Sequence, residues 1–118
     1  MANKSFSLEL NSKIKPFSKI IKVDSDKSLS IRSFLIASIS QNISKVDNVL
    51  ESEDVFSTIS CLRKLGVKIK KKKTGSYLIY GKGLGSLFAK KNLNLNLGNS
   101  GTACRLLIGI LSSTPNIE

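Results

Sequence analysis

Apolar positions along the chain change between strand spacing and helical spacing. Residues 16–23 (PFSKIIKV) predict a first strand, and the polar turn that follows contains several capping residues. Residues 28–40 (SLSIRSFLIASIS) place their apolar side chains at helical spacing, with Asp26 or Ser28 as the candidate N-cap. A short apolar run at 46–50 predicts a second strand.

The clearest helical signal covers residues 52–65. Ser52 is a favourable N-cap, and Glu53 and Asp54 suit the positive end of the helix dipole. Apolar residues share one face of this segment, and Gly66 stands where a left-handed C-cap belongs. We therefore expect a second helix that ends at Leu65.

A hairpin and a second strand–helix pair follow. Val67 and Ile69 alternate with lysines, Thr74-Gly75 turns the chain, and residues 76–80 return. After a glycine-rich loop, the alternating leucines of 93–97 predict another strand. A last helix is expected from Gly101 or Thr102 to Leu111.

The predicted order of elements is β-α-β-α-β-β followed by β-α. This alternation indicates an α/β (α+β) fold in which helices pack on a sheet. The last β-α pair looks like the start of a second unit that Glu118 interrupts, so we expect a truncated protein.

Composition limits the chain to one small domain of 118 residues and 12.8 kDa. No apolar run is long enough to span a bilayer, and the N-terminus lacks the apolar core of a signal peptide. The chain has no histidine, which argues against a zinc site or a histidine-based triad. Cys61 and Cys104 lie among apolar neighbours, so we expect two buried free thiols rather than a disulfide or a metal site.

The formal net charge is +11 and comes mostly from lysine. Its densest run, residues 68–73 (KIKKKK), is compatible with a nucleic-acid-binding module or with the solvated tip of a hairpin. No aromatic residues interleave with this run and arginine is scarce, which disfavours nucleic acid. A basic chain can equally serve a small polyanionic substrate.

Two segments that lead into predicted helices contain candidate ligand-binding residues, and we call them joints. The first joint begins the helix near residue 28. Lys27 and Ser28 lie at the helix start, and Arg32 follows Ser28 by four residues and shares its face. Free amides, a hydroxyl, an ammonium and a guanidinium would form an anion site there. The alternative is a solvated helix start whose cations have no ligand.

The second joint is LNLNLGNSGTACRLL, residues 93–107. Gly98 and Gly101 permit close approach of a ligand to the backbone, and Asn99, Ser100 and Thr102 offer short polar groups. The alternative is that the glycines only allow tight strand–helix packing and that Thr102 is a cap. Arg105 could face this site or point to solvent.

These residues resemble a known family. DKSLSIR and LGNSGTACRLL are similar to the lysine-serine-arginine element and the Gly-Asn-(Ala/Ser)-Gly-Thr-Ala-x-Arg signature of 5-enolpyruvylshikimate-3-phosphate synthases. NVLESEDVFSTISCLRKLGVKI, which lies between them, resembles that family's helix with a Ser-x-Asp-Val start. The three elements cover roughly residues 20–112. A resemblance to UDP-N-acetylglucosamine enolpyruvyl transferases is weaker, because those have asparagine after the lysine and lack Gly-Thr-Ala-x-Arg.

The resemblance implies transfer of the enolpyruvyl group of phosphoenolpyruvate to the 5-hydroxyl of shikimate 3-phosphate, in chorismate and aromatic amino-acid biosynthesis, without metal or organic cofactor. It implies that Lys27, Ser28 and Arg32 bind shikimate 3-phosphate. Lys27, Gly101, Asn99 and Thr102 would bind phosphoenolpyruvate. Glyphosate sensitivity of the complete enzyme is expected, since Gly101 leaves that pocket uncrowded.

The resemblance also implies an inside-out α/β enolpyruvyl-transferase lobe made of β-α-β-α-β-β units, with one complete unit and the start of a second. Residues 1–16 would be an arm or strand that associates with the other lobe, and 17–118 an incomplete substrate-binding lobe. Catalytic residues are expected beyond Glu118, so the chain alone should be inactive. The expected partner is the missing C-terminal lobe in a cytoplasmic monomer, without nucleic acid or membrane. One departure from the family pattern is that Asp24-Ser25 stands before Lys27 where the family usually has Pro-Gly.

Overall fold

The computed structural model describes residues 5–115. Its elements, in chain order, are α1 (Lys27–Ile39), β1 (Ile43–Val46), α2 (Glu53–Lys64), β2 (Lys68–Lys73), β3 (Ser76–Tyr80) and α3 (Gly101–Ser112). The strands form one antiparallel sheet in the order β1-β3-β2. The structure thus mixes three helices with a three-stranded antiparallel sheet, which confirms the expected α/β class.

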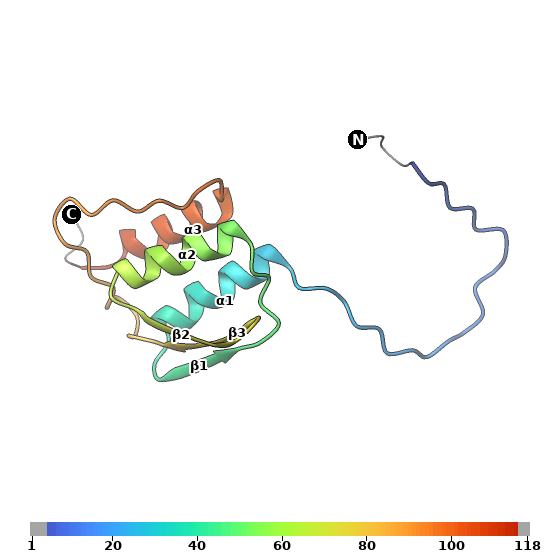
Figure 1. The fold of residues 1–118 in the computed structure, drawn as a ribbon, viewed down its shortest axis with the longest axis horizontal. Helices are drawn as coiled ribbons and strands as arrows, with labels where there is room; N and C mark the ends of the chain where they lie inside the picture. Colours follow the sequence, from blue (N-terminus) through green and yellow to red (C-terminus); the bar gives the residue numbers. More distant parts are fainter. Residues whose placement is uncertain (1–4, 116–118) are drawn as a thin grey trace.

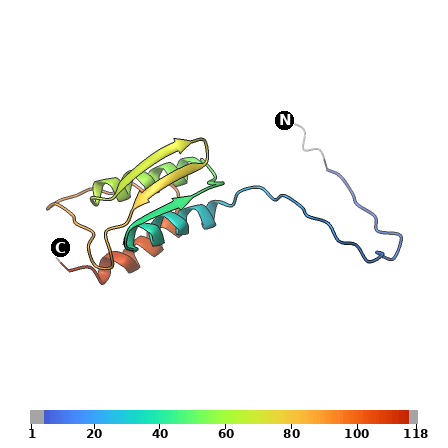
Figure 2. The same cartoon turned by 90° about the horizontal axis from the view of Figure 1, so that it is seen from below.

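The elements are stacked in layers (Figure 1). Helices α1 and α2 cover one face of the sheet, where α1 contacts β1 and β3 and α2 contacts β2. Helix α3 packs on α1, on the side away from the sheet, as the turned view also shows (Figure 2). Phe34 of α1 is fully buried, and its ring meets that of Tyr77 of β3 edge-on with centroids 5.2 Å apart. This aromatic pair joins the helical layer to the sheet.

Each helix begins at a residue whose side chain accepts a backbone N–H. Asp26 Oδ1 accepts from Leu29 N at 2.7 Å, so Asp26 rather than Ser28 caps α1. Ser52 caps α2 as expected, although its bond to Val55 N is 3.5 Å long. Ser100 caps α3, so the alternative in which Thr102 is the cap is wrong. Each cap satisfies one of the amides that a helix start leaves open.

Two predicted strands are not strands. Residues 16–23 are extended and exposed, with Phe17 and Ile20 at 73% and 103% relative exposure, and they pair with no strand among residues 5–115. In 93–97 the leucines are half-buried and the asparagines exposed, as the alternation predicted, yet this segment also has no strand partner in the described chain. The second predicted strand is displaced: β1 spans Ile43–Val46 instead of 46–50, because Asn48 adopts φ +58°.

The lysine run is a strand rather than a hairpin tip. Residues 68–73 form β2, an edge strand of the sheet, and only Thr74-Gly75 makes the turn. The ammonium of Lys68 lies 4.9 Å from the centre of the Tyr80 ring, and Ile69 is the buried member of the strand. The predicted hairpin itself is confirmed.

The segment before α1 runs away from the domain as an extended chain (Figure 1). The proposed boundary between an arm at 1–16 and a lobe at 17–118 stays a prediction, and residues 1–4 and 116–118 of those ranges lie outside the described residues. In the described part of the chain, no helix has the length and apolar character needed to cross a membrane.

Candidate anion-binding site

The N-termini of all three helices face the same end of the domain (Figure 1). This is the end at which the extended segment enters α1, and α2 and α3 also begin there. A helix N-terminus carries a partial positive charge and unpaired N–H groups. Three parallel helices therefore direct their positive ends toward one region, which favours anions.

The start of α1 leaves two amides open. Asp26 binds the third amide of the helix, on Leu29, whereas the amides of Lys27 and Ser28 have no acceptor within residues 5–115. Ser28 is half-buried, and its neighbour Ser30 instead turns inward to accept from Leu50 N at 3.0 Å. Lys27 and Ser28, which sequence analysis identified at this joint, thus present free backbone N–H donors within the described chain.

The second joint builds the same arrangement at α3. Gly98 has φ +60°, a conformation that glycine adopts without strain, and its amide donates to Asn96 Oδ1 at 2.9 Å. Ser100 Oγ accepts from the amide of Ala103 at 3.1 Å. The amides of Gly101 and Thr102 have no acceptor in the described part of the chain.

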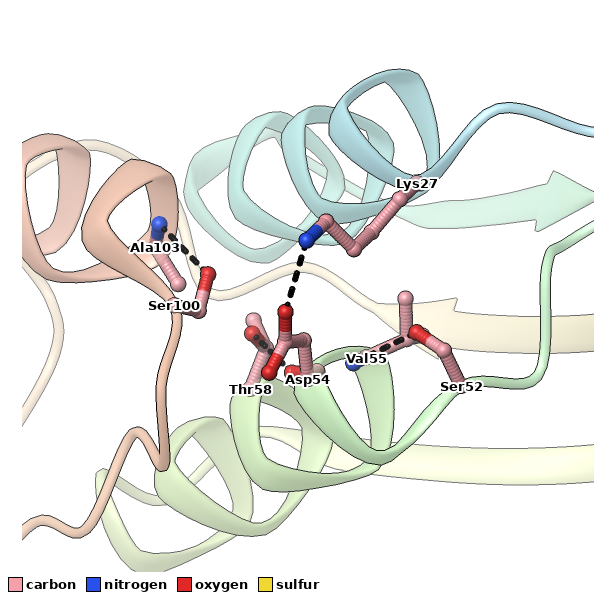
Figure 3. Close-up of polar contacts among 7 residues, drawn as sticks. All are labelled: Lys27, Ser52, Asp54, Val55, Thr58, Ser100 and Ala103. Carbon is pink, nitrogen blue, oxygen red and sulfur yellow. Dashed lines mark hydrogen bonds and ion pairs between the residues drawn. The ribbon is translucent and has the colours of Figure 1, made fainter. Parts of the chain in front are cut away.

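The first turn of α2 connects the two joints (Figure 3). Asp54 Oδ2 lies 2.9 Å from Lys27 Nζ, and a Cβ placed on Gly98 would lie 4.0 Å from Asp54 Oδ1 and 3.2 Å from Ser57 Oγ. Sequence reasoning gave Asp54 only a helix-dipole role and did not consider Ser57. Asp54 and Ser57 are three residues apart and therefore share one helical face, and this spacing was the sequence signal that could have identified them.

The remaining candidates take different positions. The guanidinium of Arg105 lies next to Gly101, with Nη2 3.7 Å from the position of a Cβ there. Arg32 is exposed and borders an apolar groove between α1 and α3, together with Leu106 and Ile110. Asn99 is exposed and, within the described residues, its side chain makes no hydrogen bond.

A cleft of about 650 Å³ adjoins the α3 joint on the side of α2. Lys64, Gly98 and Ser100 contribute to its lining, and Lys64 Nζ donates to Asn94 O at 3.1 Å. Cys104 also borders it and is exposed, so the expectation of two buried thiols is wrong for this residue. Cys61 is buried and free as expected, and burial raises the pKa of its thiol. In residues 5–115, no group of three or more potential ligands could hold a metal ion.

Glu51 fixes the loop that leads into α2. Its carboxylate accepts from Lys71 Nζ, from Gly75 N at 3.0 Å and from the Tyr77 hydroxyl at 2.7 Å. These donors, the Lys71 ammonium first, lower the pKa of Glu51 to about 2. Burial, together with the bond to Glu51, raises the pKa of Tyr77 to about 12. The hairpin turn is thereby tied to the chain just before the Ser52 cap.

Comparison with known proteins identifies the family. The family model for EPSP synthase (3-phosphoshikimate 1-carboxyvinyltransferase) matches residues 11–117. The chain belongs to the EPSP synthase family. The 3-phosphoshikimate 1-carboxyvinyltransferase of Bacillus cytotoxicus is 46% identical over 95 residues, which are 80% of this chain and 22% of that protein. The protein of the same name from Leptospira interrogans is 43% identical over 106 residues, which are 90% of this chain and 24% of the relative.

A solved structure agrees with this assignment. The EPSP synthase from Acinetobacter baumannii superimposes with a TM-score of 0.71 at 38% sequence identity, and the match covers 80% of this chain and 21% of that one. The chain therefore spans between a fifth and a quarter of the length of these EPSP synthase relatives.

Proposed function

We propose that this chain supplies a substrate-binding wall for transfer of the enolpyruvyl group of phosphoenolpyruvate to the 5-hydroxyl of shikimate 3-phosphate. The observation that carries the proposal is the convergence of three helix N-termini. Two of them, on α1 and α3, have amides that find no acceptor within residues 5–115, at Lys27, Ser28, Gly101 and Thr102. Both substrates carry a phosphate and a carboxylate, and such groups bind to helix N-termini and to cations. Membership of the EPSP synthase family supports this choice of substrates.

The two joints have different roles in this proposal. Lys27, Ser28 and Arg32 of α1 bind shikimate 3-phosphate, and Lys27 also reaches phosphoenolpyruvate. Gly101 and Thr102 offer backbone amides to phosphoenolpyruvate, with Asn99 at the rim of the pocket. Cations and preorganised amides offset the mutual repulsion of the two anionic substrates and stabilise charge that develops during the transfer.

We propose further that the 118-residue chain binds these ligands without turning them over. The joints provide ammonium, guanidinium, hydroxyl and amide groups. Two carboxylates beside these groups are already engaged: Asp26 caps α1, and Asp54 pairs with Lys27. Proton transfer is assigned to the rest of a complete enzyme, which is a cytoplasmic monomer in this proposal. That remaining part would pack on the extended segment before α1 and on the α1–α3 groove.

Isothermal titration of the chain with shikimate 3-phosphate tests the binding step. We expect saturable binding that Arg32→Ala and Ser28→Ala abolish and that Lys90→Ala, a change in an exposed loop, leaves unaltered. Absence of binding at millimolar ligand would refute the proposal for the α1 joint. A phosphate-release assay on the same chain should show no turnover, and turnover at a rate typical of enzymes would contradict that part.

A further inference from the structure

A single carboxylate, that of Asp54, pairs with Lys27 of the first joint and lies near Gly98 of the second. One oxygen lies 2.9 Å from Lys27 Nζ, and the other lies 4.0 Å from the position that a Cβ on Gly98 would occupy. The Asp54 side chain is 17% exposed, whereas that of Lys27 is 48% exposed (Figure 3). The acid is thus held in place, and the ammonium is the partner that incoming ligands can reach.

We propose that Asp54 is a specificity-determining residue that selects against small anions at Lys27; this inference rests on the function proposed above. With no ligand bound, the Asp54 carboxylate forms an ion pair with the Lys27 ammonium. An anion that bonds to the same ammonium comes within a few ångströms of the carboxylate, and like charges at that range repel. Binding at Lys27 therefore requires further contacts that outweigh this repulsion.

Open amides at the starts of α1 and α3 supply those contacts for a large ligand. The amides of Ser28 on α1 and of Gly101 and Thr102 on α3 are free donors in the described chain. A ligand with two separated anionic groups can use donors from both helices at once. Inorganic phosphate is too small to do so, and it experiences the repulsion without the compensation. Asp54 thus makes the site discriminate by ligand size and by number of anionic groups.

The closing experiment titrates inorganic phosphate into the whole chain at constant ionic strength, with amide chemical shifts as the readout. Asp54→Asn removes the charge but keeps an oxygen that Lys27 can bond. We expect it to tighten phosphate binding about fivefold, the size expected for repulsion between partly screened charges about 5 Å apart. The gain in phosphate affinity should disappear when Lys27→Ala is added, because Asp54→Asn acts by freeing the Lys27 ammonium from its ion pair.

Glu53→Gln is the matched control. It removes the same charge from the same helical turn, but Glu53 is exposed and forms no ion pair with the described residues. We expect it to change phosphate affinity by less than a factor of about two, through the helix dipole and long-range charge alone. Asp54→Ser is the second variant if Asp54→Asn fails to fold, since it also removes the carboxylate and leaves the Ser52 cap in place.

The outcomes separate this inference from the proposed function. Tighter phosphate binding that depends on Lys27 supports the role of Asp54. If phosphate binds the parent chain through Lys27 but Asp54→Asn leaves the affinity unchanged or weakens it, the role of Asp54 is overturned and the anion site stands. If no variant binds phosphate and the parent binds neither phosphate nor shikimate 3-phosphate, both proposals are overturned.

Discussion

Replacement of Gly81 by alanine should strongly destabilise the domain. Gly81 follows β3 where the chain crosses the C-terminal end of α1, and its amide donates to Asn42 O at 2.8 Å. An added Cβ would overlap the carbonyl oxygen of Ser40 and would lie 2.7 Å from that of Ala37. Both obstacles are backbone atoms, so no side-chain rotation can relieve the clash.

The magnitude follows from what must move. Overpacking costs about 1–3 kcal/mol where side chains can adjust. Here α1 and the β3 exit must separate, which also strains the bonds from Lys82 N to Ser38 O and from Gly83 N to Ser40 O, each 3.0 Å long. Each such bond contributes about 1 kcal/mol. We therefore expect Gly81→Ala to lower the free energy of unfolding by about 3–5 kcal/mol.

Gly109→Ala is the matched control, because the chemical change is the same and the expected sign is opposite. Gly109 lies inside α3 and a Cβ there meets nothing within 4 Å. Alanine in a helix interior should raise the free energy of unfolding by about 0.5–1 kcal/mol. Urea unfolding followed by circular dichroism at 222 nm measures both variants. A Gly81→Ala protein within about 1 kcal/mol of the parent would refute the reasoning.

Three further changes test other parts of the structure. Glu51→Gln should reduce the loss of stability in acid. The pKa of Glu51 is lowered from 4.5 to about 2, so its carboxylate stabilises the fold above pH 4.5 and ceases to do so as the pH falls toward 2. Equal losses of stability in parent and variant between pH 7 and pH 2.5 would contradict this. Ser100→Ala should cost about 1–2 kcal/mol and Ser52→Ala less, because the Ser100 cap bond is 3.1 Å and buried whereas that of Ser52 is 3.5 Å; urea unfolding should reproduce this order. Gly101→Ala should leave stability unchanged, since the new Cβ meets Arg105 at an ordinary 3.7 Å, but should weaken phosphoenolpyruvate binding in a titration; unchanged affinity would remove Gly101 from the site.

Features that depend on neighbouring residues were predictable from the sequence. The helix starts at Asp26 and Ser52 follow from capping chemistry, and the turn at Thr74-Gly75 follows from the left-handed preference of glycine, whose φ there is +70°. The α2 helix ends at Lys64, next to the expected Leu65, with Gly66 at φ +92°. The open amides at both joints follow from the same local rules.

Features that depend on distant partners were not predictable. Alternation in 93–97 correctly assigned which side chains face the core, but it cannot show whether another strand accepts the backbone hydrogen bonds. The exposure of Cys104 depends on which face of α3 packs against α1. The contact of Asp54 with Lys27 spans 27 positions in the sequence, and only the packing of α2 beside α1 creates it.

The lysines of β2 have a consequence for how copies of this protein meet in solution. An edge strand exposes a row of unpaired N–H and C=O groups that can template a strand of another molecule. Four successive lysines, Lys70–Lys73, lie along this edge, and all are exposed. Two such edges would bring like charges together as they approached, so the charge protects against aggregation. These four lysines therefore act as gatekeepers against β-aggregation, and this role needs no anionic partner.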